Sequence, residues 1–249
     1  ADFVGRKKYL YDDNGHGTHV AGIIAGSGKG SNGKYRGIAP DTFLVSVKVL
    51  DKSGNGKIEN VVEAAGWIIE NKSAMNIRVV NISFGTRAKM ENGPAIETGE
   101  DDYALIMAVE KMWDSGIVVV AAAGNNGPGN TSVTAPGISK KIITVGAFDD
   151  KNFFSGRGPT RECIVKPEVV VTGSNIIACN NHQGRYSSKS GTSMAAPVVS
   201  GAVARLIKNN PDITPKEVKI WMKSCCKKIN VPSEKQGWGV LDIRKFVTG

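Results

Sequence analysis

The sequence predicts an α/β fold in which a mostly parallel central sheet is flanked by helices. Two observations carry this prediction. Strand-like segments alternate with helix-like ones, and the strand-like segments are continuously apolar, which is typical of parallel sheets buried on both faces. No repeat, low-complexity tract or Pro- or Ser-rich linker divides the 249 residues, so we expect one domain, residues 1–249.

The individual elements follow from composition and period. Strands are expected where β-branched and other apolar residues run together, at residues 43–50, 78–83, 117–122 and 142–145. Helices are expected where apolar residues recur at helical spacing, at residues 58–71, 101–115, 194–209 and 215–223. The last helix is entered through Thr214-Pro215, a favourable start because proline is preorganised for the first turn.

Composition excludes several classes of protein. The longest apolar run, residues 117–123, is far shorter than the roughly 20 residues that span a bilayer, so no membrane partner is expected. The net charge is +9, but no aromatic residues interleave with the C-terminal lysines, so we expect no nucleic-acid partner. Four cysteines are too few for a disulfide scaffold. Free thiols favour a reducing, cytoplasmic compartment over secretion without deciding between them.

Two motifs resemble ligand sites but lack an essential part. Residues 28–34 follow the phosphate-loop pattern until Tyr35, which stands where Ser or Thr is required. His16 and His19 lie near Asp12 and Asp13, but no third imidazole or thiolate cluster stands nearby to complete a metal site. We predict neither nucleotide nor metal binding here.

Three polar residues lie where parallel elements end or begin. His16 opens a Gly- and Ala-lined helix and could act as a general base. Ser193 begins a buried, Ala-rich helix, where it could be a nucleophile or simply a helix cap. Asn125 follows the apolar strand 117–122, where it could form a turn or donate to an oxyanion. Together they supply the groups that acyl transfer requires.

Four motifs in order carry a family resemblance. They are His16-Gly-Thr-His-Val-Ala-Gly, Asn81-Ile-Ser-Phe-Gly, Ala123-Gly-Asn125 and Gly191-Thr-Ser-Met-Ala-Ala-Pro197. With them the chain resembles the subtilisin-like serine proteases, or subtilases, from about Asp12 onwards. The resemblance implies a subtilisin-like three-layer fold and an endopeptidase that acts on polypeptides.

The resemblance also implies roles for single residues. His16 would be the general base, Ser193 the nucleophile and Asn125 an oxyanion donor. Substrate-binding residues would lie on two edges and in one pocket: Ser83, Phe84 and Gly85 on one edge, Gly54, Asn55 and Gly56 on the other, and Gly124 in the pocket. A pro-segment is a partner that the family implies. Calcium stabilises many members, but the loop 29–35 contains no carboxylate, so we expect no cofactor.

One family feature has no counterpart in the sequence. The catalytic aspartate of subtilases ends the first sheet strand about thirty residues before the histidine, and only 15 residues precede His16. We therefore expect that the chain was cut upstream, that the first strand is missing, and that the fragment is weakly active or inactive alone. The alternative is a non-catalytic protein that binds a peptide or a protease. A lipase or esterase is disfavoured, because Gly191-Thr-Ser193-Met-Ala lacks the Gly-x-Ser-x-Gly elbow.

Overall fold

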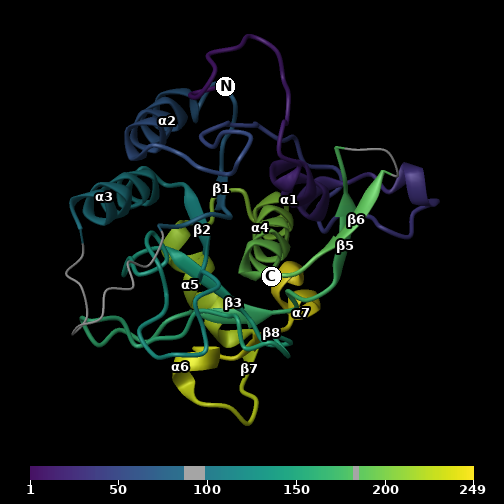
Figure 1. The fold of residues 1–249 in the computed structure, drawn as a ribbon. Helices are drawn as coiled ribbons and strands as arrows, with labels where there is room; N and C mark the ends of the chain where they lie inside the picture. Colours follow the sequence, from purple (N-terminus) through teal and green to yellow (C-terminus); the bar gives the residue numbers. More distant parts are fainter. Residues whose placement is uncertain (87–98, 182–184) are drawn as a thin grey trace.

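The computed structural model describes residues 1–86, 99–181 and 185–249 (Figure 1). A six-stranded sheet forms its centre, in the order β1-β2-β3-β4-β8-β7. In this order, the pairs β1–β2, β2–β3, β3–β4 and β4–β8 are parallel, and the last pair, β8–β7, is antiparallel. Their bounds are Val79–Ile82 (β1), Val118–Ala122 (β2), Ile143–Ala147 (β3), Val169–Val171 (β4), Cys226–Lys227 (β7) and Val240–Leu241 (β8).

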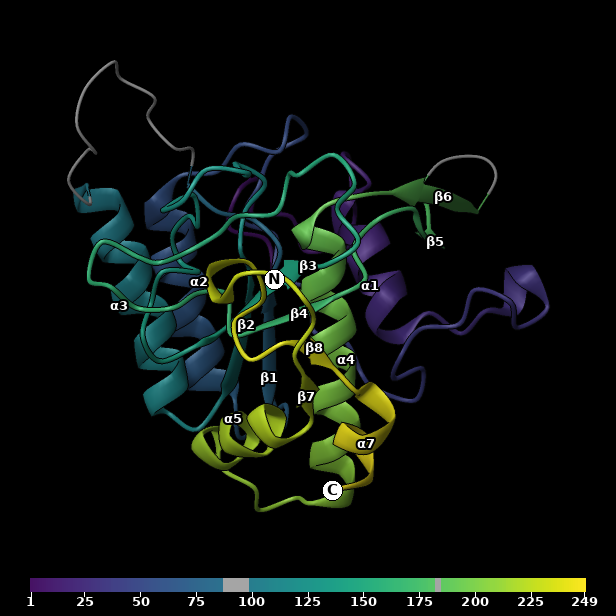
Figure 2. The same ribbon diagram turned by 90° about the horizontal axis from the view of Figure 1, so that it is seen from below.

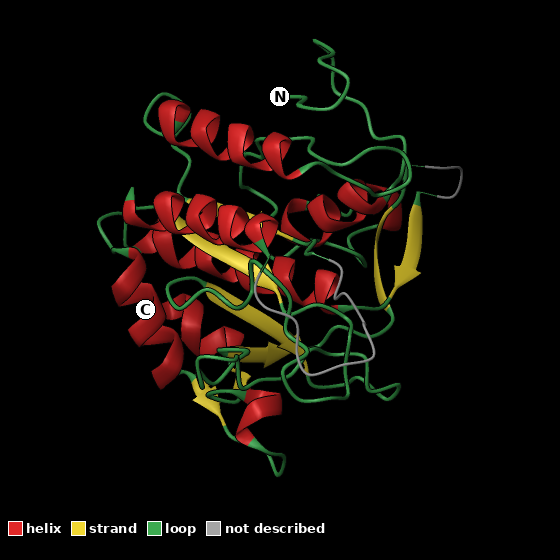
Figure 3. Ribbon diagram, turned by 60° about the vertical axis from the view of Figure 1, so that its left-hand side comes forward, coloured by secondary structure: helices red, strands yellow, loops and turns green. Residues whose placement is uncertain are grey.

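Helices cover both faces of this sheet (Figures 2 and 3). Helices α2 (Ile58–Asn71) and α3 (Glu100–Asp114) pack together on one face. Helix α4 (Thr192–Asn209) crosses the other face against β1, β2 and β3, with α1 (His16–Ala25) and α7 (Ile243–Thr248) beside it. The predicted α/β architecture, with a mostly parallel sheet between helices, is confirmed.

The remaining elements are short or peripheral. They are the 3-10 helix η1 (Lys29–Ser31), helices α5 (Pro215–Ser224) and α6 (Ser233–Gln236), and the antiparallel hairpin of β5 (Ile176–Cys179) and β6 (Tyr186–Lys189). Helix α5 begins with a capping box, in which Thr214 and Glu217 satisfy each other's backbone N–H groups, and Pro215 stands in its first turn. Within residues 1–86, 99–181 and 185–249, none of the helices has the length and hydropathy of a membrane-spanning segment.

Apolar burial explains why these segments are strands. All five residues of β2 and all five of β3 are buried, because both faces of the sheet are covered. Helix α4 approaches its neighbours closely at Gly201, where a Cβ would lie 2.7 Å from the Cβ of Ile38. Because β1 and β2 are parallel, their carboxyl ends lie at the same edge of the sheet. The N-terminus of α4 lies at this edge too, where Ser83 contacts Ser193.

The predicted strand at residues 43–50 is wrong for the described structure. This segment makes only an isolated bridge, between Lys48 and Asp2, and the side chain of Phe43 is 99% exposed. Strand β1 is the first strand of the sheet, so among the described residues only its β2 edge is paired. A strand forms only where a neighbour accepts its hydrogen bonds, and apolar β-branched residues alone do not supply one.

Candidate active site

Ser193 is the second residue of α4 and shares a pair of hydrogen bonds with Ser83. The hydroxyl of Ser193 donates to the carbonyl oxygen of Ser83 at 3.0 Å, and the hydroxyl of Ser83 donates to the carbonyl oxygen of Ser193 at 3.0 Å. Gly191 precedes the helix with φ +149°, a conformation that only glycine adopts readily. The segment after β1 and the first turn of α4 are therefore tied together at Ser193.

Asn125 follows β2 and is held by the residue before Ser193. Its side-chain oxygen accepts hydrogen bonds from the backbone N–H and the hydroxyl of Thr192, at 3.0 and 3.1 Å. The Thr192 hydroxyl in turn accepts from the Gly124 N–H at 3.1 Å. With its oxygen engaged, the Asn125 amide keeps both donors of its Nδ2 without a partner among the described residues.

One cavity brings together half of the ten predicted site residues. It has a volume of about 390 Å³ and includes five of them: Phe84, Gly85, Gly124, Asn125 and Ser193. Thr86, Ala122, Asn126 and Thr134 complete its lining. The cavity lies at the carboxyl edge of the parallel sheet, where ligand sites of such sheets are found.

His16 is the first residue of α1, and Asp12 holds the turn that leads to it. The Asp12 carboxylate accepts hydrogen bonds from the N–H groups of Asn14, Gly15 and Thr18, at 2.8 to 3.0 Å, and from the Thr18 hydroxyl at 2.6 Å. These bonds help hold the pKa of Asp12 at about 2, against the opposing effect of burial. Asp12 thus positions the helix end and does not contact the imidazole ring.

The His16 ring is half-buried and has no hydrogen-bond partner among the described residues. Burial lowers its pKa below the ordinary value, the positive charge of Lys189 lowers it further, and Asp12 opposes both. His16 does not line the cavity of Ser193, although α1 packs along α4. His19 is buried, with its Nε2 3.0 Å from the carbonyl oxygen of Ser187.

The predicted second edge, Gly54 to Gly56, lies outside that cavity. Gly54 adopts φ +78° in a turn, and a Cβ there would lie 3.8 Å from Nδ2 of Asn14. Asn14 also donates to the carbonyl oxygen of Lys52 at 2.9 Å. The turn is therefore beside the residues that precede His16 and is not part of the lining of the Ser193 cavity.

Sequence reasoning missed Thr134, Thr192 and Lys189. Thr134 and Lys189 stand in no motif, and Thr192 stands in the Gly191-to-Pro197 motif without a role of its own, while each of the three acts on segments distant in the chain. For Thr192 alone a signal was available, because it adjoins Ser193 at the start of a buried helix.

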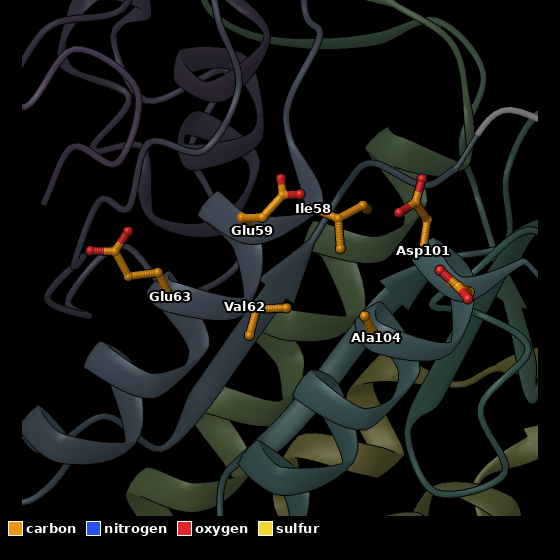
Figure 4. A pocket seen from close by; sticks show the side chains of 7 residues that line it. Ile58, Glu59, Val62, Glu63, Asp101 and Ala104 are labelled. Carbon is orange, nitrogen blue, oxygen red and sulfur yellow. The ribbon is translucent and has the colours of Figure 1, made fainter.

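A second hollow, of about 540 Å³, lies between the first turns of α2 and α3 (Figure 4). Ile58, Val62 and Ala104 form its apolar part, and carboxylates of Glu59, Glu63, Glu100 and Asp101 surround them. Glu63 forms an ion pair with Arg6 at 2.6 Å. This hollow contains no nucleophile or imidazole.

The described residues offer little to a metal ion. The loop 29–35 consists of Lys, Gly, Ser, Asn and Tyr, whereas calcium requires several oxygen ligands, usually including carboxylates. No group of three His, Cys, Asp or Glu side chains suited to a metal occurs in residues 1–86, 99–181 and 185–249. The residues of that loop therefore do not fit calcium.

Comparison with known proteins decides the family. The subtilase family model matches residues 2–239. The chain belongs to the subtilase family. This subtilase is 40% identical over 251 residues to serine protease AprX of Bacillus subtilis (strain 168), covering 90% of the chain and 55% of AprX, so it spans about half the length of that relative.

Other relatives agree with this family and fold. Subtilisin DY of Bacillus licheniformis is 35% identical to the subtilase over 221 residues, which cover 88% of the chain and 73% of subtilisin DY. The solved structure of Sphericase matches it with a TM-score of 0.81 at 26% identity, over 96% of the chain and 82% of that structure. The subtilisin-like fold expected from the motifs is confirmed.

Proposed function

We propose that the chain hydrolyses peptide bonds as a serine endopeptidase, with Ser193 as nucleophile and His16 as general base. The observation that carries this proposal is the orientation of Asn125. Thr192 engages the amide oxygen of Asn125, so the Nδ2 donors remain for a ligand in the cavity that Ser193 also lines. Donors held in advance at the position of a developing oxyanion stabilise the transition state of acyl transfer.

The reaction uses the described groups in sequence. The Ser193 oxygen attacks the substrate carbonyl carbon and its proton passes to His16, while Asn125 Nδ2 and the Ser193 N–H stabilise the oxyanion. His16 then gives the proton to the leaving amine, and water hydrolyses the acyl-enzyme by the same route. Before attack, the Ser193 hydroxyl must turn away from the carbonyl oxygen of Ser83, to which it donates in the structure.

The substrate backbone runs between two segments. Ser83 to Gly85 pair with it on one side and Gly54 to Gly56 on the other, as in β-strand addition. The side chain before the scissile bond enters the cavity beside Gly124. Support for this path comes from the cavity lining and from the position of the Gly54 turn next to Asn14, two residues before His16.

A carboxylate that is not among the partners of His16 in the described residues completes the site. Three observations support this part of the proposal: the His16 ring lacks a carboxylate partner among the described residues, the outer edge of β1 is unpaired there, and apolar residues 43–45 are exposed. An additional strand that ends in an aspartate would pair with an open edge and orient His16. Loss of that aspartate lowers turnover by roughly 10⁴-fold in trypsin, so the chain alone is a poor protease.

The test is hydrolysis of a fluorogenic peptide with and without a synthetic strand peptide, defined here as a short apolar peptide ending in Asp-Thr-Gly. We expect slow hydrolysis by the chain alone and a large gain with the strand peptide. A matched peptide ending in Asn-Thr-Gly and the Ser193→Ala variant serve as controls. If the chain with strand peptide is no faster than Ser193→Ala, the endopeptidase proposal is wrong.

A second candidate, a non-catalytic protein that binds peptides through the same cleft, is favoured only by the missing carboxylate partner of His16. It predicts that the chain binds an extended peptide but cleaves none, even with the strand peptide present. Binding without cleavage, followed by fluorescence anisotropy, would support it.

A further inference from the structure

Thr134 is a buried residue that lines the cavity of Ser193 and that no motif singles out. It is 8% exposed, and its backbone N–H donates to the carbonyl oxygen of Ala123 at 3.2 Å. This bond places Thr134 directly beside the segment that leads to Gly124 and Asn125. Among the described residues its hydroxyl has no hydrogen-bond partner.

Two glycines on opposite segments face this one hydroxyl. A Cβ at Gly85 would lie 2.6 Å from Oγ1 of Thr134, and a Cβ at Gly124 would also lie 2.6 Å from it. Gly85 belongs to the segment after β1, and Gly124 to the segment after β2. Oγ1 of Thr134 therefore touches both backbone segments and closes the gap between them.

This gap is where the proposed substrate path puts the side chain before the scissile bond. The total volume of the cavity does not set how far that side chain enters, because an aromatic ring must fit between the two glycine segments. The Thr134 hydroxyl occupies that space. A ring pushed against it would also bury an unpaired hydroxyl, which costs about 1–3 kcal/mol.

We infer that Thr134 limits the depth of the pocket for the residue before the scissile bond, so that the protease cleaves after short side chains, Ala and Ser, in preference to aromatic ones. This inference rests on the proposed endopeptidase function. A serine in the pocket can exchange a hydrogen bond with the Thr134 hydroxyl, and an alanine stops above it. An aromatic side chain can do neither.

Peptidyl phosphonates test this inference, because they form a covalent adduct with an activated serine. Three reagents differ only in the last side chain, which is Ala, Ser or Phe, and a fluorophosphonate without a peptide reports reactivity alone. All are used with the 249-residue chain and the strand peptide. We expect the Ala and Ser reagents to label Ser193 at least about tenfold faster than the Phe reagent.

Variants at Thr134 separate size from polarity. Thr134→Gly and Thr134→Ala deepen the pocket by removing side-chain atoms at its bottom. Each should raise the ratio of the labelling rate with the Phe reagent to that with the Ala reagent, by about tenfold or more for Thr134→Gly. Thr134→Val keeps the shape without the hydroxyl, so the Phe reagent should remain slow. Circular dichroism melts identify any variant that does not fold, and the two smaller residues provide independent tests.

The outcomes separate the inference from the function. If the fluorophosphonate labels Ser193 but the wild-type chain takes Phe as fast as Ala, the inference is overturned and the endopeptidase proposal stands. The same holds if neither Thr134→Gly nor Thr134→Ala changes the ratio. If no reagent labels Ser193, both are wrong.

Discussion

Ser83 and Ser193 exchange two hydrogen bonds, each from the hydroxyl of one residue to the carbonyl oxygen of the other, and both 3.0 Å long. The pair joins the end of β1 to the first turn of α4. It also fixes the proposed nucleophile beside the segment proposed to bind the substrate backbone. The same two residues thus form a structural contact and include the proposed nucleophile.

Replacing Ser83 should reduce stability. In Ser83→Ala the carbonyl oxygen of Ser193 loses a donor, and the Asn81 Nδ2 loses the acceptor that it contacts at 2.9 Å. Unpaired buried polar groups cost about 1–3 kcal/mol, so we expect a fall of that size in the free energy of unfolding, measured in urea. Ser188→Ala removes an exposed hydroxyl and should change the free energy of unfolding by at most about 0.5 kcal/mol. Equal losses in the two variants would contradict the role of the pair.

Asn125 allows stability and catalysis to be separated. Asn125→Asp keeps the oxygen that accepts from Thr192 but replaces the Nδ2 donors with a second oxygen. We expect turnover to fall by about 10²- to 10³-fold, the cost of one oxyanion donor in a subtilisin, itself a member of this family. The measurement is kcat and KM of the wild type and of Asn125→Asp for a peptide substrate, with the strand peptide present. An unchanged kcat would show that Asn125 does not contact the oxyanion.

Lys189 and Asp12 should move the pH dependence in opposite directions. Burial and Lys189 lower the pKa of His16, and Asp12 raises it. Because the base must be neutral, labelling of Ser193 increases as pH rises through this pKa. Lys189→Met should raise the pKa and shift the acid limb of the rate to higher pH, and Asp12→Asn should shift it lower. Lys189→Arg keeps the charge and should leave the limb in place. If Lys189→Met leaves the acid limb of the pH–rate profile in place, the charge of Lys189 does not set the pKa of His16.

Lys166 should make stability depend on alkaline pH. Its ammonium is fully buried and contacts both carboxylate oxygens of Glu168, at 2.7 and 2.9 Å, while Lys219 contacts the same carboxylate at 2.9 Å. Burial lowers the pKa of Lys166 from 10.5 to about 8, with Lys219 acting in the same direction and Glu168 opposing. Between these values the unfolded chain retains the proton and the folded chain releases it. The contribution of Lys166 to stability therefore increases as pH rises through this window and is lost as pH falls towards 8.

Urea unfolding at pH 7.5 and 10 measures this effect against Lys166→Met. The free energy of unfolding of the wild type relative to the variant should be about 2 kcal/mol more favourable at pH 10. Lys228→Met, at an exposed lysine, should show no such difference. A relative stability that stays constant or falls between the two pH values would refute the assignment.

Local patterns predicted the buried parallel strands and the longer helices, because their apolar residues repeat with the period of the element. The helix expected at residues 58–71 has these bounds in the structure, and the one expected at 101–115 is Glu100–Asp114. Strands of two residues, such as β7 and β8, carry no period to detect. Residues 43–50 have the composition of a strand, but strand formation depends on a neighbour, which composition does not supply.

The same division applies to the site. His16, Asn125 and Ser193 stand in short motifs, so local sequence was sufficient to propose them. Thr134 is recognisable only through its contacts with Gly85 and Gly124, which lie far from it in the chain or across a turn. The hydrogen bonds of Asp12 to the turn before His16 likewise needed coordinates, because the sequence shows only a carboxylate near a histidine.

The most direct test of the central claim is fluorophosphonate labelling of the chain with the strand peptide present, with the adduct located by mass spectrometry of tryptic peptides. We predict a single adduct on Ser193, none in Ser193→Ala, and labelling at least about 10²-fold slower in His16→Ala. Absence of an adduct on Ser193, or equal rates in the wild type and His16→Ala, would contradict it.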